Sequence, residues 1–333
     1  MPRPAAFHPM LHRFAQFVAA FTVLLILAGS LVTSTGSGLS VPDWPTTYGW
    51  NMFTFPPQMW VGGIFYEHGH RLIASTVGLL TIVLAVWLWR SDRRTWVRRL
   101  GVTALAAVIL QGLLGGLTVL FFLPAPISTA HAALAEIFFC LTVALALFTS
   151  NGWLRGDDAI DDGPLRTVAT TTSALIYVQI LVGATMRHTG AGLAIPDFPL
   201  MFGGLVPDHW DAAIGVHFTH RVGAVIVTAA VIATSAHVWF RQRDKKALVR
   251  PAVLLVMLVA VQFTLGALTV LSQRHVAINS AHVVCGALVL ATSLTLTLRS
   301  WRIRFSMAEG VTPVRAASGH PRPAASTAHG VSA

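Results

Sequence analysis

The sequence predicts an all-α integral membrane protein whose eight transmembrane helices form two pseudo-symmetric four-helix bundles. The 333-residue chain is 54% hydrophobic and only 11% charged, whereas a soluble domain carries about 25% charged residues. Eight segments are apolar over a length that can cross a bilayer, which takes about 20 residues. The two halves of the chain also share several motifs in the same order. These three observations together predict the fold.

The predicted spans follow one another from residue 14 to residue 298. An apolar run that follows basic residues can also be a signal peptide, but removing the first span would leave seven spans and break the repeat described below. The predicted spans cover residues 14–32, 67–89, 100–123, 129–149, 167–186, 215–239, 252–271 and 278–298.

The basic residues predict the orientation of these spans. All but four of the 23 lysines and arginines fall in the two terminal stretches and in the second, fourth and sixth connections. Loops rich in lysine and arginine stay in the cytoplasm, so both termini are predicted to be cytoplasmic in a bacterial-type inner or cell membrane. The net charge of +10 is then explained by topology and contact with membrane lipid, not by nucleic-acid binding. Residues 305–333 are predicted to form a disordered cytoplasmic tail.

The two halves of the chain match at a spacing of about 150 residues. Each half has an even number of spans, so both begin on the same side, and the repeat is parallel in tandem. We therefore expect one bundle over residues 14–150 and another over 167–300. Small residues in the repeat (Gly115, Gly116, Gly183 and Gly266) suit close helix packing. The matching motifs are 36–45 with 190–199, His70-Arg71 with His220-Arg221, Gln111–Thr118 with Gln262–Thr269, and His131 with His282.

Four histidines recur in register, one on each even-numbered span near its outer end: His70, His131, His220 and His282. Each half thus supplies a pair from two different helices. Two imidazoles that face each other across a bundle suit axial ligation of a haem iron, whereas zinc favours more protein ligands. The alternative is that these histidines form hydrogen bonds between helices.

Arg71 and Arg221 each follow the first histidine of a pair. A guanidinium pairs well with a carboxylate, so both are candidate partners of haem propionates. The alternative is that both side chains extend toward the lipid headgroups.

The repeat breaks at Glu67, whose counterpart in the second half is His217. A carboxylate at this position can accept a proton or stabilise positive charge on a substrate, so Glu67 is a candidate catalytic residue of the first half. The alternative is a solvated glutamate at the membrane interface. The roles of His68, His217 and Glu136 stay open, and the long outer loops could cap the haem edges or form an interfacial belt.

At these residues the sequence resembles the haem A synthase family of membrane enzymes, which act in cytochrome oxidase assembly. The resemblance covers about residues 14–300 and depends on the Glu67-x-x-His70-Arg71 motif, the loop 38–44, His131, His220-Arg221 and His282. It implies a duplicated eight-helix bundle that oxidises a porphyrin methyl group of haem O to a formyl group, which gives haem A. It also implies haem b as the redox cofactor.

The resemblance implies a role for each matching motif position. His70 and His131 would be ligands of the substrate haem, and Glu67 would lie beside it. His220 and His282 would bind haem b. Haem O synthase and cytochrome oxidase assembly factors are the implied partners. Some bacterial members carry a cysteine pair in the first outer loop, but residues 34–66 contain no cysteine, so a disulfide relay there is excluded.

Two other function classes fit part of the pattern. A di-haem electron-transfer cytochrome without substrate chemistry would use the same four histidines, but it does not explain the Glu67 asymmetry. A transporter built from parallel repeats would be expected to have interrupted spans with polar groups at the midplane, whereas these histidines lie near one end of their spans.

Overall fold

The computed structural model describes residues 7–156 and 159–308 and is helical throughout its apolar segments. Eight helices are long and apolar enough to cross a membrane, which confirms the predicted number of spans. They are α1 (Pro9–Ser34), α2 (Gly63–Ser91), α3 (Thr95–Leu120), α4 (Ala125–Phe148), α6 (Gly163–His188), α7 (Ala212–Arg241), α8 (Lys246–Leu271) and α9 (Val276–Ser300). Short helices α5 (Asn151–Arg155) and α10 (Arg302–Ala308) follow α4 and α9.

Most helices extend a few residues beyond the predicted spans, but the third span was predicted too long. Helix α3 ends at Leu120, and residues 121–123 form its C-terminal cap. The amide of Leu123 donates to the carbonyl of Thr118 (2.7 Å), and the amide of Phe122 donates to Val119 (3.1 Å). This is a Schellman motif, which requires a left-handed residue after the helix, and Phe122 has a φ of 59°.

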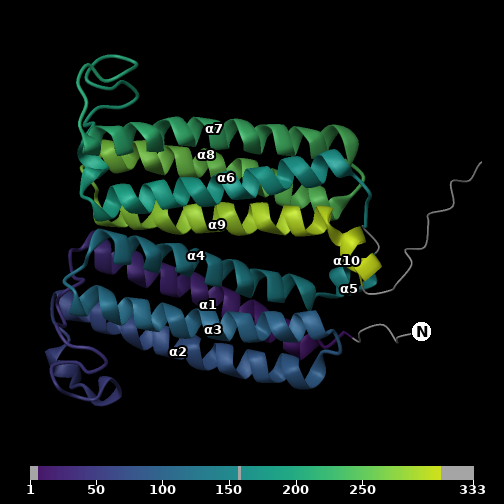
Figure 1. Cartoon of the computed structure of the whole chain (residues 1–333), viewed down its shortest axis with the longest axis horizontal. Coiled ribbons are helices and arrows are strands. Elements are labelled where there is room, and N and C mark those ends of the chain that lie inside the picture. Colours follow the sequence, from purple (N-terminus) through teal and green to yellow (C-terminus); the bar gives the residue numbers. More distant parts are fainter. Residues whose placement is uncertain (1–6, 157–158, 309–333) are drawn as a thin grey trace, which may run out of the picture.

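The helices pack as two groups of four that lie side by side (Figure 1). In the first group α1 and α3 both contact α2 and α4, and in the second group α6 and α8 both contact α7 and α9. Each group has an apolar core, built around Val18, Leu84 and Leu145 in the first and Val231, Leu255 and Leu290 in the second. The groups meet where α1 and α4 contact α9, and where α4 also contacts α6.

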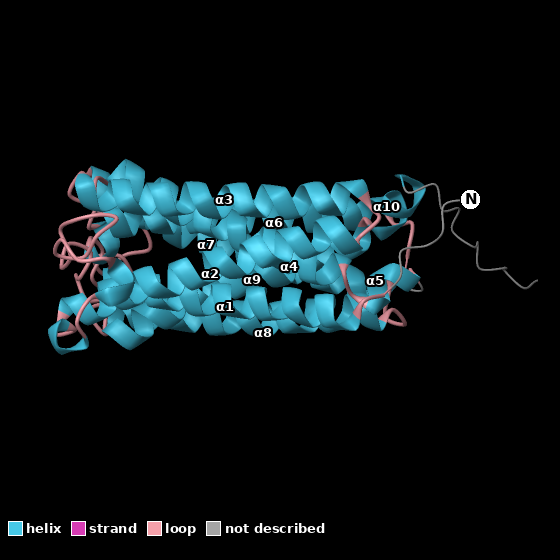
Figure 2. Cartoon of the chain, turned by 90° about the horizontal axis from the view of Figure 1, so that it is seen from below, coloured by secondary structure: helices cyan, strands magenta, loops and turns pink. Residues whose placement is uncertain are grey.

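The helix axes run nearly parallel, so the molecule has two distinct ends (Figure 2). At one end, which we call the loop end, lie the first loop (residues 35–62) and the second loop (residues 189–211). These loops contain short 3-10 turns at Met52–Thr54, Pro57–Met59 and Ala191–Leu193. The loop end is where the candidate site is built.

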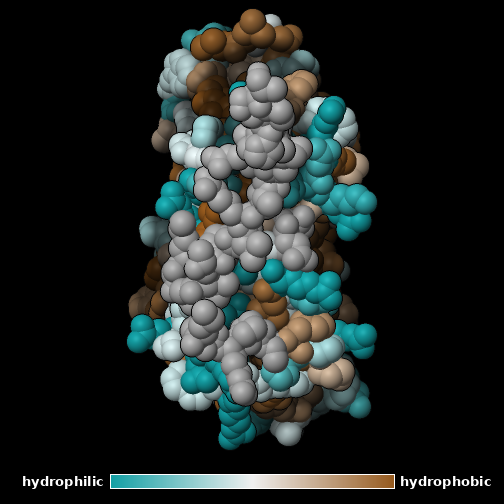
Figure 3. All heavy atoms as spheres, turned by 90° about the vertical axis from the view of Figure 1, so that its right-hand side faces the viewer, coloured by the Kyte–Doolittle hydropathy of each residue, from teal (hydrophilic) through white to brown (hydrophobic). Residues whose placement is uncertain are grey.

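The opposite end, which we call the terminal end, carries the start of α1 together with α5 and α10 (Figure 1). Hydrophilic side chains are spread over this face (Figure 3). The disordered tail was predicted to begin at residue 305, but residues 305–308 belong to helix α10. The rest of the predicted tail, residues 309–333, lies outside the described part of the chain.

Candidate functional site

Each of the four predicted histidines lies against a glycine of the preceding helix. A Cβ atom on Gly29 of α1 would lie 3.0 Å from Cε1 of His70 on α2. Real Cβ contacts are rarely this short, so a side chain at these positions would displace the ring. The same contact recurs at Gly115 with His131 (3.1 Å), Gly183 with His220 (2.8 Å) and Gly266 with His282 (3.1 Å).

Gly115, Gly183 and Gly266 therefore do more than let helices pack closely, which is the role that the sequence predicts for them, and Gly29 shares the additional role. They provide the space that places an imidazole between two helices. Gly116 has a related use, because a Cβ atom there would overlap the ring of Trp44 in the first loop. The pattern of one glycine per histidine was present in the sequence, but their contact depends on how adjacent helices align.

The structure brings the second histidine pair together. The ring centroids of His220 and His282 are 6.5 Å apart, with an interplanar angle of 76°. Because metal–imidazole bonds are about 2 Å long, this separation leaves room for one metal ion between the rings. In the first half, His70 on α2 and His131 on α4 each lie against the glycine of the neighbouring helix.

The ring nitrogens of these histidines are suited to metal ligation. The Nδ1 atoms of His70, His131 and His282 are buried, and none has a hydrogen-bond partner among the described residues. Buried polar atoms are normally hydrogen-bonded, so each of these three rings has a nitrogen that can bind a group from outside the chain. Within the described ranges, no cluster of three or more His, Cys, Asp or Glu side chains is arranged to hold a metal ion. Two imidazoles therefore fit a metal whose other ligands belong to a cofactor, as in haem.

Two glutamines contact histidines of the site from the neighbouring helix. The amide nitrogen of Gln111 donates to the carbonyl oxygen of His131 (3.0 Å) and lies 3.4 Å from its Nε2 atom. Gln179 does the same to His220, at 2.7 Å from the carbonyl oxygen and 3.0 Å from Nδ1. Each glutamine amide thus contacts both the backbone and the ring of its histidine, which fixes the position of the helix and the orientation of the imidazole.

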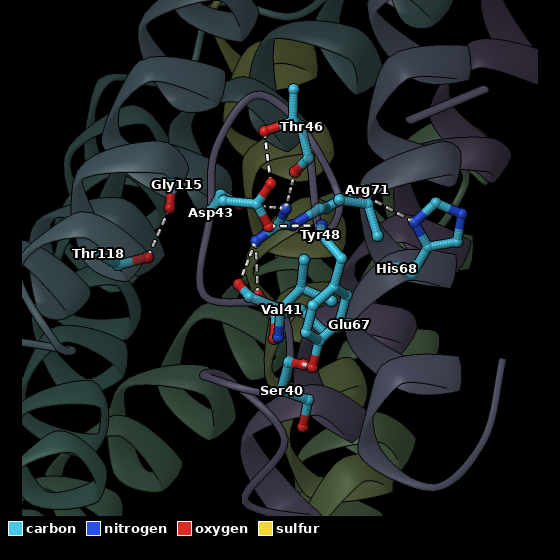
Figure 4. Close-up of polar contacts among 11 residues, drawn as sticks. Ser40, Val41, Asp43, Thr46, Tyr48, Glu67, His68, Arg71, Gly115 and Thr118 are labelled. Carbon is cyan, nitrogen blue, oxygen red and sulfur yellow. Dashed lines mark hydrogen bonds and ion pairs between the residues drawn. The ribbon is translucent and has the colours of Figure 1, made fainter. Parts of the chain in front are cut away.

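Glu67 lies under the first loop, where it is 3% exposed. Its Oε2 atom accepts the backbone N–H of Val41 (2.8 Å), and its Oε1 atom lies 2.7 Å from Nη2 of Arg71, one turn further along α2 (Figure 4). Both oxygens are thus engaged in attaching the first loop to α2. In the sequence Glu67 stands three residues before His70, but no motif indicates this attachment.

Arg71 binds the first loop through backbone carbonyls (Figure 4). Its Nη1 atom donates to the carbonyls of Asp43 (2.7 Å) and Thr46 (2.9 Å), and Nη2 donates to that of Val41 (2.9 Å). The Arg71 side chain is 9% exposed. Arg71 therefore anchors the loop, and its pairing with a haem propionate stays a prediction.

The second half makes the corresponding contacts with a different side chain. His217 accepts the backbone N–H of Ile195 at Nδ1 (3.2 Å), and its Nε2 lies 3.2 Å from Nε of Arg221. Arg221 donates to the carbonyls of Ile195 (3.0 Å), Asp197 (2.7 Å) and Leu200 (3.0 Å). His217 therefore takes the place of Glu67 as a loop anchor, and the propionate role of Arg221 likewise stays a prediction.

An aspartate organises the turn in each loop. Asp43 accepts the amides of Tyr48 (2.7 Å) and Gly49 (2.9 Å), and Asp197 accepts those of Phe202 (2.8 Å) and Gly203 (2.9 Å). Burial alone would raise the pKa of Asp43, but the hydrogen bonds from Gly49, Thr46 and Tyr48 hold it below its usual value. The amides of Gly203 and Phe202 lower the pKa of Asp197 in the same way. Both loops are therefore ordered by ionised carboxylates.

His68 lies on a different face of α2 from His70. It is fully buried, its ring packs against Phe55 (5.0 Å between centroids) and Trp60 (4.7 Å), and its Nδ1 atom lies 3.2 Å from Oγ1 of Thr47. All three partners belong to the first loop, so His68 helps to hold that loop. Glu136 is buried in α4 with an unpaired Oε2 atom in the described structure, and its role stays open.

The helices and the paired histidines define a multi-pass membrane protein with a half-buried histidine pair in each half. Residues 12–294 match the model of a family described as cytochrome oxidase assembly protein. The chain belongs to this family.

Curated relatives match along most of their length. The chain is 31% identical to a protein named "Heme A synthase" from Shouchella clausii, over 80% of this chain and 89% of the relative. It is 28% identical to "Heme A synthase" from Halalkalibacterium halodurans, with 86% and 95% covered. It is 30% identical to the protein of that name from Symbiobacterium thermophilum, with 79% and 86% covered.

Proposed function

We propose that this protein is a haem A synthase, which converts haem O into haem A by oxidising a porphyrin methyl group to a formyl group. The observation that carries the proposal is the half-buried histidine pair in each half of a chain from the cytochrome oxidase assembly family. Haem b is the proposed redox cofactor, and when bound it would supply one-electron oxidation and reduction. The relatives named "Heme A synthase" support the substrate and the product.

The two histidine pairs have separate roles in this proposal. His70 and His131 hold the substrate haem between α2 and α4, and His220 and His282 hold haem b between α7 and α9. The 6.5 Å ring separation in the second half supports the presence of one metal between His220 and His282. The glycines beside all four rings support ligation by fixed imidazoles.

Glu67 has two roles in this proposal. Its hydrogen bond to Val41 and its ion pair with Arg71 hold the first loop over the loop end of α2. It also places a carboxylate at the position where the second half has the imidazole of His217. A fixed negative charge stabilises positive charge that develops on a nearby substrate. The charge, rather than the anchoring, is what distinguishes the substrate half.

The loops and the topology complete the proposal. Because the loop anchors lie within one turn of His70 and His220, the two loops would cover the haem edges and limit access of water. The basic residues of the terminal end support cytoplasmic termini, and in that orientation the haem sites would lie near the outer face. Haem O synthase and cytochrome oxidase assembly factors are the proposed protein partners.

The proposal is tested by co-expressing the protein with a haem O synthase and identifying the extracted haems by chromatography. We expect the wild-type protein to contain haem b together with haem O or haem A. His131→Ala should retain haem b and lose the other haems, and His282→Ala should lose haem b. Haem b alone in the wild-type protein would contradict the proposal.

A di-haem electron-transfer cytochrome is the second candidate function. It is favoured by one observation, which is that Glu67 and His217 attach their loops by matching contacts. The same extraction separates the two functions, because such a cytochrome would contain one kind of haem in both halves and would leave haem O unchanged.

A further inference from the structure

Two arginines lie at the loop end of the second half without an acidic partner. Arg187 is in the last turn of α6, and Arg274 is in the turn that joins α8 to α9. Neither forms an ion pair with an aspartate or a glutamate among the described residues. Charged side chains of transmembrane segments normally have a partner, so the two arginines can bind an anion from outside the chain.

The acidic side chains of the loop end already have other partners. Glu67, Asp43 and Asp197 hold the two loops through the contacts described above. Asp211 caps the start of α7, and Asp208 contacts the ring of the histidine that follows it. At this end of the described chain, no carboxylate is therefore left for the two arginines.

Arg187 uses only part of its guanidinium to contact the first half. Its Nη2 atom donates to the carbonyl oxygen of Ser30 (2.8 Å) and to Oγ of Ser34 (3.1 Å), both on α1. Its Nε and Nη1 atoms have no hydrogen-bond partner among the described residues. Since a guanidinium has five N–H donors, three of them remain for a ligand.

Arg274 has all its donors free within the described residues. Its side chain lies against the second loop, where a Cβ atom on Gly192 would be 3.7 Å from its Cδ atom. This contact involves only the apolar stem of the side chain. The guanidinium group of Arg274 can therefore bind a ligand without breaking a contact of the protein.

The two arginines flank the histidine pair of the second half. Arg187 follows Gly183 by one helical turn, and Gly183 faces the ring of His220. Helices α6 and α8 both contact α7 and α9 (Figure 1), so they lie on either side of the space between His220 and His282. A planar cofactor that both rings ligate stands across the line between them, and its edges face α6 and α8. The arginines at the ends of these two helices thus lie toward its loop-end edge.

The first half has neither arginine. In the repeat, Thr33 stands at the position of Arg187, and Leu123 stands at that of Arg274. The contacts support the second match, because Leu123 lies 3.2 Å from a Cβ atom on Gly38 of the first loop, as Arg274 lies against the corresponding glycine of the second loop. Only the second half therefore has this pair of cations.

We propose that Arg187 and Arg274 bind the two propionate carboxylates of the haem in the second half. The inference depends on the proposed function, in which His220 and His282 hold haem b. A guanidinium and a carboxylate can form two parallel N–H···O bonds, which are stronger than bonds between neutral groups. Arg221, the candidate from the sequence, instead donates to carbonyls of the second loop.

The test compares haem b with its dimethyl ester, which lacks both carboxylates. Full-length protein that retains only the second site (His131→Ala) is loaded with either ligand, and transfer to excess apomyoglobin is followed by absorbance. We expect haem b to leave about 10-fold or more slowly than the ester, because it alone forms hydrogen bonds between charged groups. Arg187→Gln combined with Arg274→Gln should speed release of haem b by that factor and leave release of the ester unchanged.

The ester separates carboxylate binding from a structural role of Arg187, since loss of its contacts with α1 would speed release of both ligands. Arg250→Gln, near the start of α8 at the terminal end, is the matched control and should change neither rate. The single variant Arg274→Gln provides a measurement if the double variant does not fold, and it should speed release of haem b alone.

Two results would overturn the inference while leaving the proposed function intact. One is equal release of haem b and the ester from the second site, and the other is equal acceleration of both ligands in the arginine variants. The first half, measured in a His282→Ala background, should not respond to these variants, and a response of the same size there would overturn the assignment to the second half. Failure of the second half to bind haem would overturn the proposed function itself.

Discussion

Glu67 and His217 accept the same hydrogen bond in the two halves of the molecule. The N–H of Val41 donates to Glu67 (2.8 Å), and the N–H of Ile195 donates to His217 (3.2 Å). Each acceptor also contacts the arginine one turn later in its helix. An imidazole can therefore anchor a loop in the way that the carboxylate of Glu67 does. A substitution at Glu67 can thus separate anchoring of the first loop from the proposed chemical role of the carboxylate.

Glu67→His should preserve the first loop and abolish conversion of haem O. The histidine supplies the acceptor that His217 supplies in the second half, but it removes the carboxylate. Glu67→Ala should in addition destabilise the protein by about 3 kcal/mol, because it leaves the buried guanidinium of Arg71 without its ion-pair partner. Activity and thermal unfolding in detergent are measured for both variants. Full activity of Glu67→His would show that the carboxylate has no chemical role.

Arg71→Lys should loosen the first loop although the positive charge is retained. A lysine cannot reproduce the fork that contacts the carbonyls of Val41, Asp43 and Thr46. Hydrogen bonds to charged groups contribute about 1.5–3 kcal/mol each. We therefore expect the free energy that stabilises the closed loop to fall by about 2 kcal/mol or more. Hydrogen exchange of residues 35–62 measures the effect, and exchange in the second loop should stay unchanged. Equal protection in the variant and the wild-type protein would contradict this role of Arg71.

Gly183→Ala should displace His220 and impair haem binding in the second half. A Cβ atom at this position would lie 2.8 Å from the ring, whereas one on Gly112 would meet nothing within 4 Å. Gly112→Ala is therefore the matched control, and it should be neutral or stabilising by up to about 1 kcal/mol because alanine favours helix. Haem content and the haem absorption spectrum measure the difference. A normal haem spectrum for Gly183→Ala would show that the His220 ring can move without loss of haem binding.

The sequence was sufficient to predict the helices and the four histidines but not the contacts around them. Hydrophobic length predicts spans because a bilayer requires about 20 apolar residues, and the eight helices confirm this. The end of α3 was predicted too late because apolar residues at 121–123 belong to a cap with positive φ, which hydropathy does not distinguish from helix.

The loop anchors required the structure. Arg71 donates to backbone carbonyls, and such acceptors have no signature in side-chain patterns. Glu67 and His217 differ chemically, so their shared contact with a loop amide could not be inferred from a residue comparison. Gln111 and Gln179 recur with Gly115 and Gly183 in the sequence, but only the structure shows that each amide contacts a histidine of the next helix.

Lowering the pH should release the two loops before the helices unfold. The pKa values of Asp43 and Asp197 lie below their usual values in the folded protein. Stabilisation by these carboxylates is therefore fully present above the unfolded pKa and is lost as the pH falls through the folded pKa. We expect hydrogen exchange at Gly49 and Gly203, corrected for its intrinsic pH dependence, to accelerate over this acidic range. Asp197→Asn should remove the pH dependence of hydrogen exchange from the second loop alone. If the second loop of this variant still opened over the same pH range, a group other than Asp197 would be responsible.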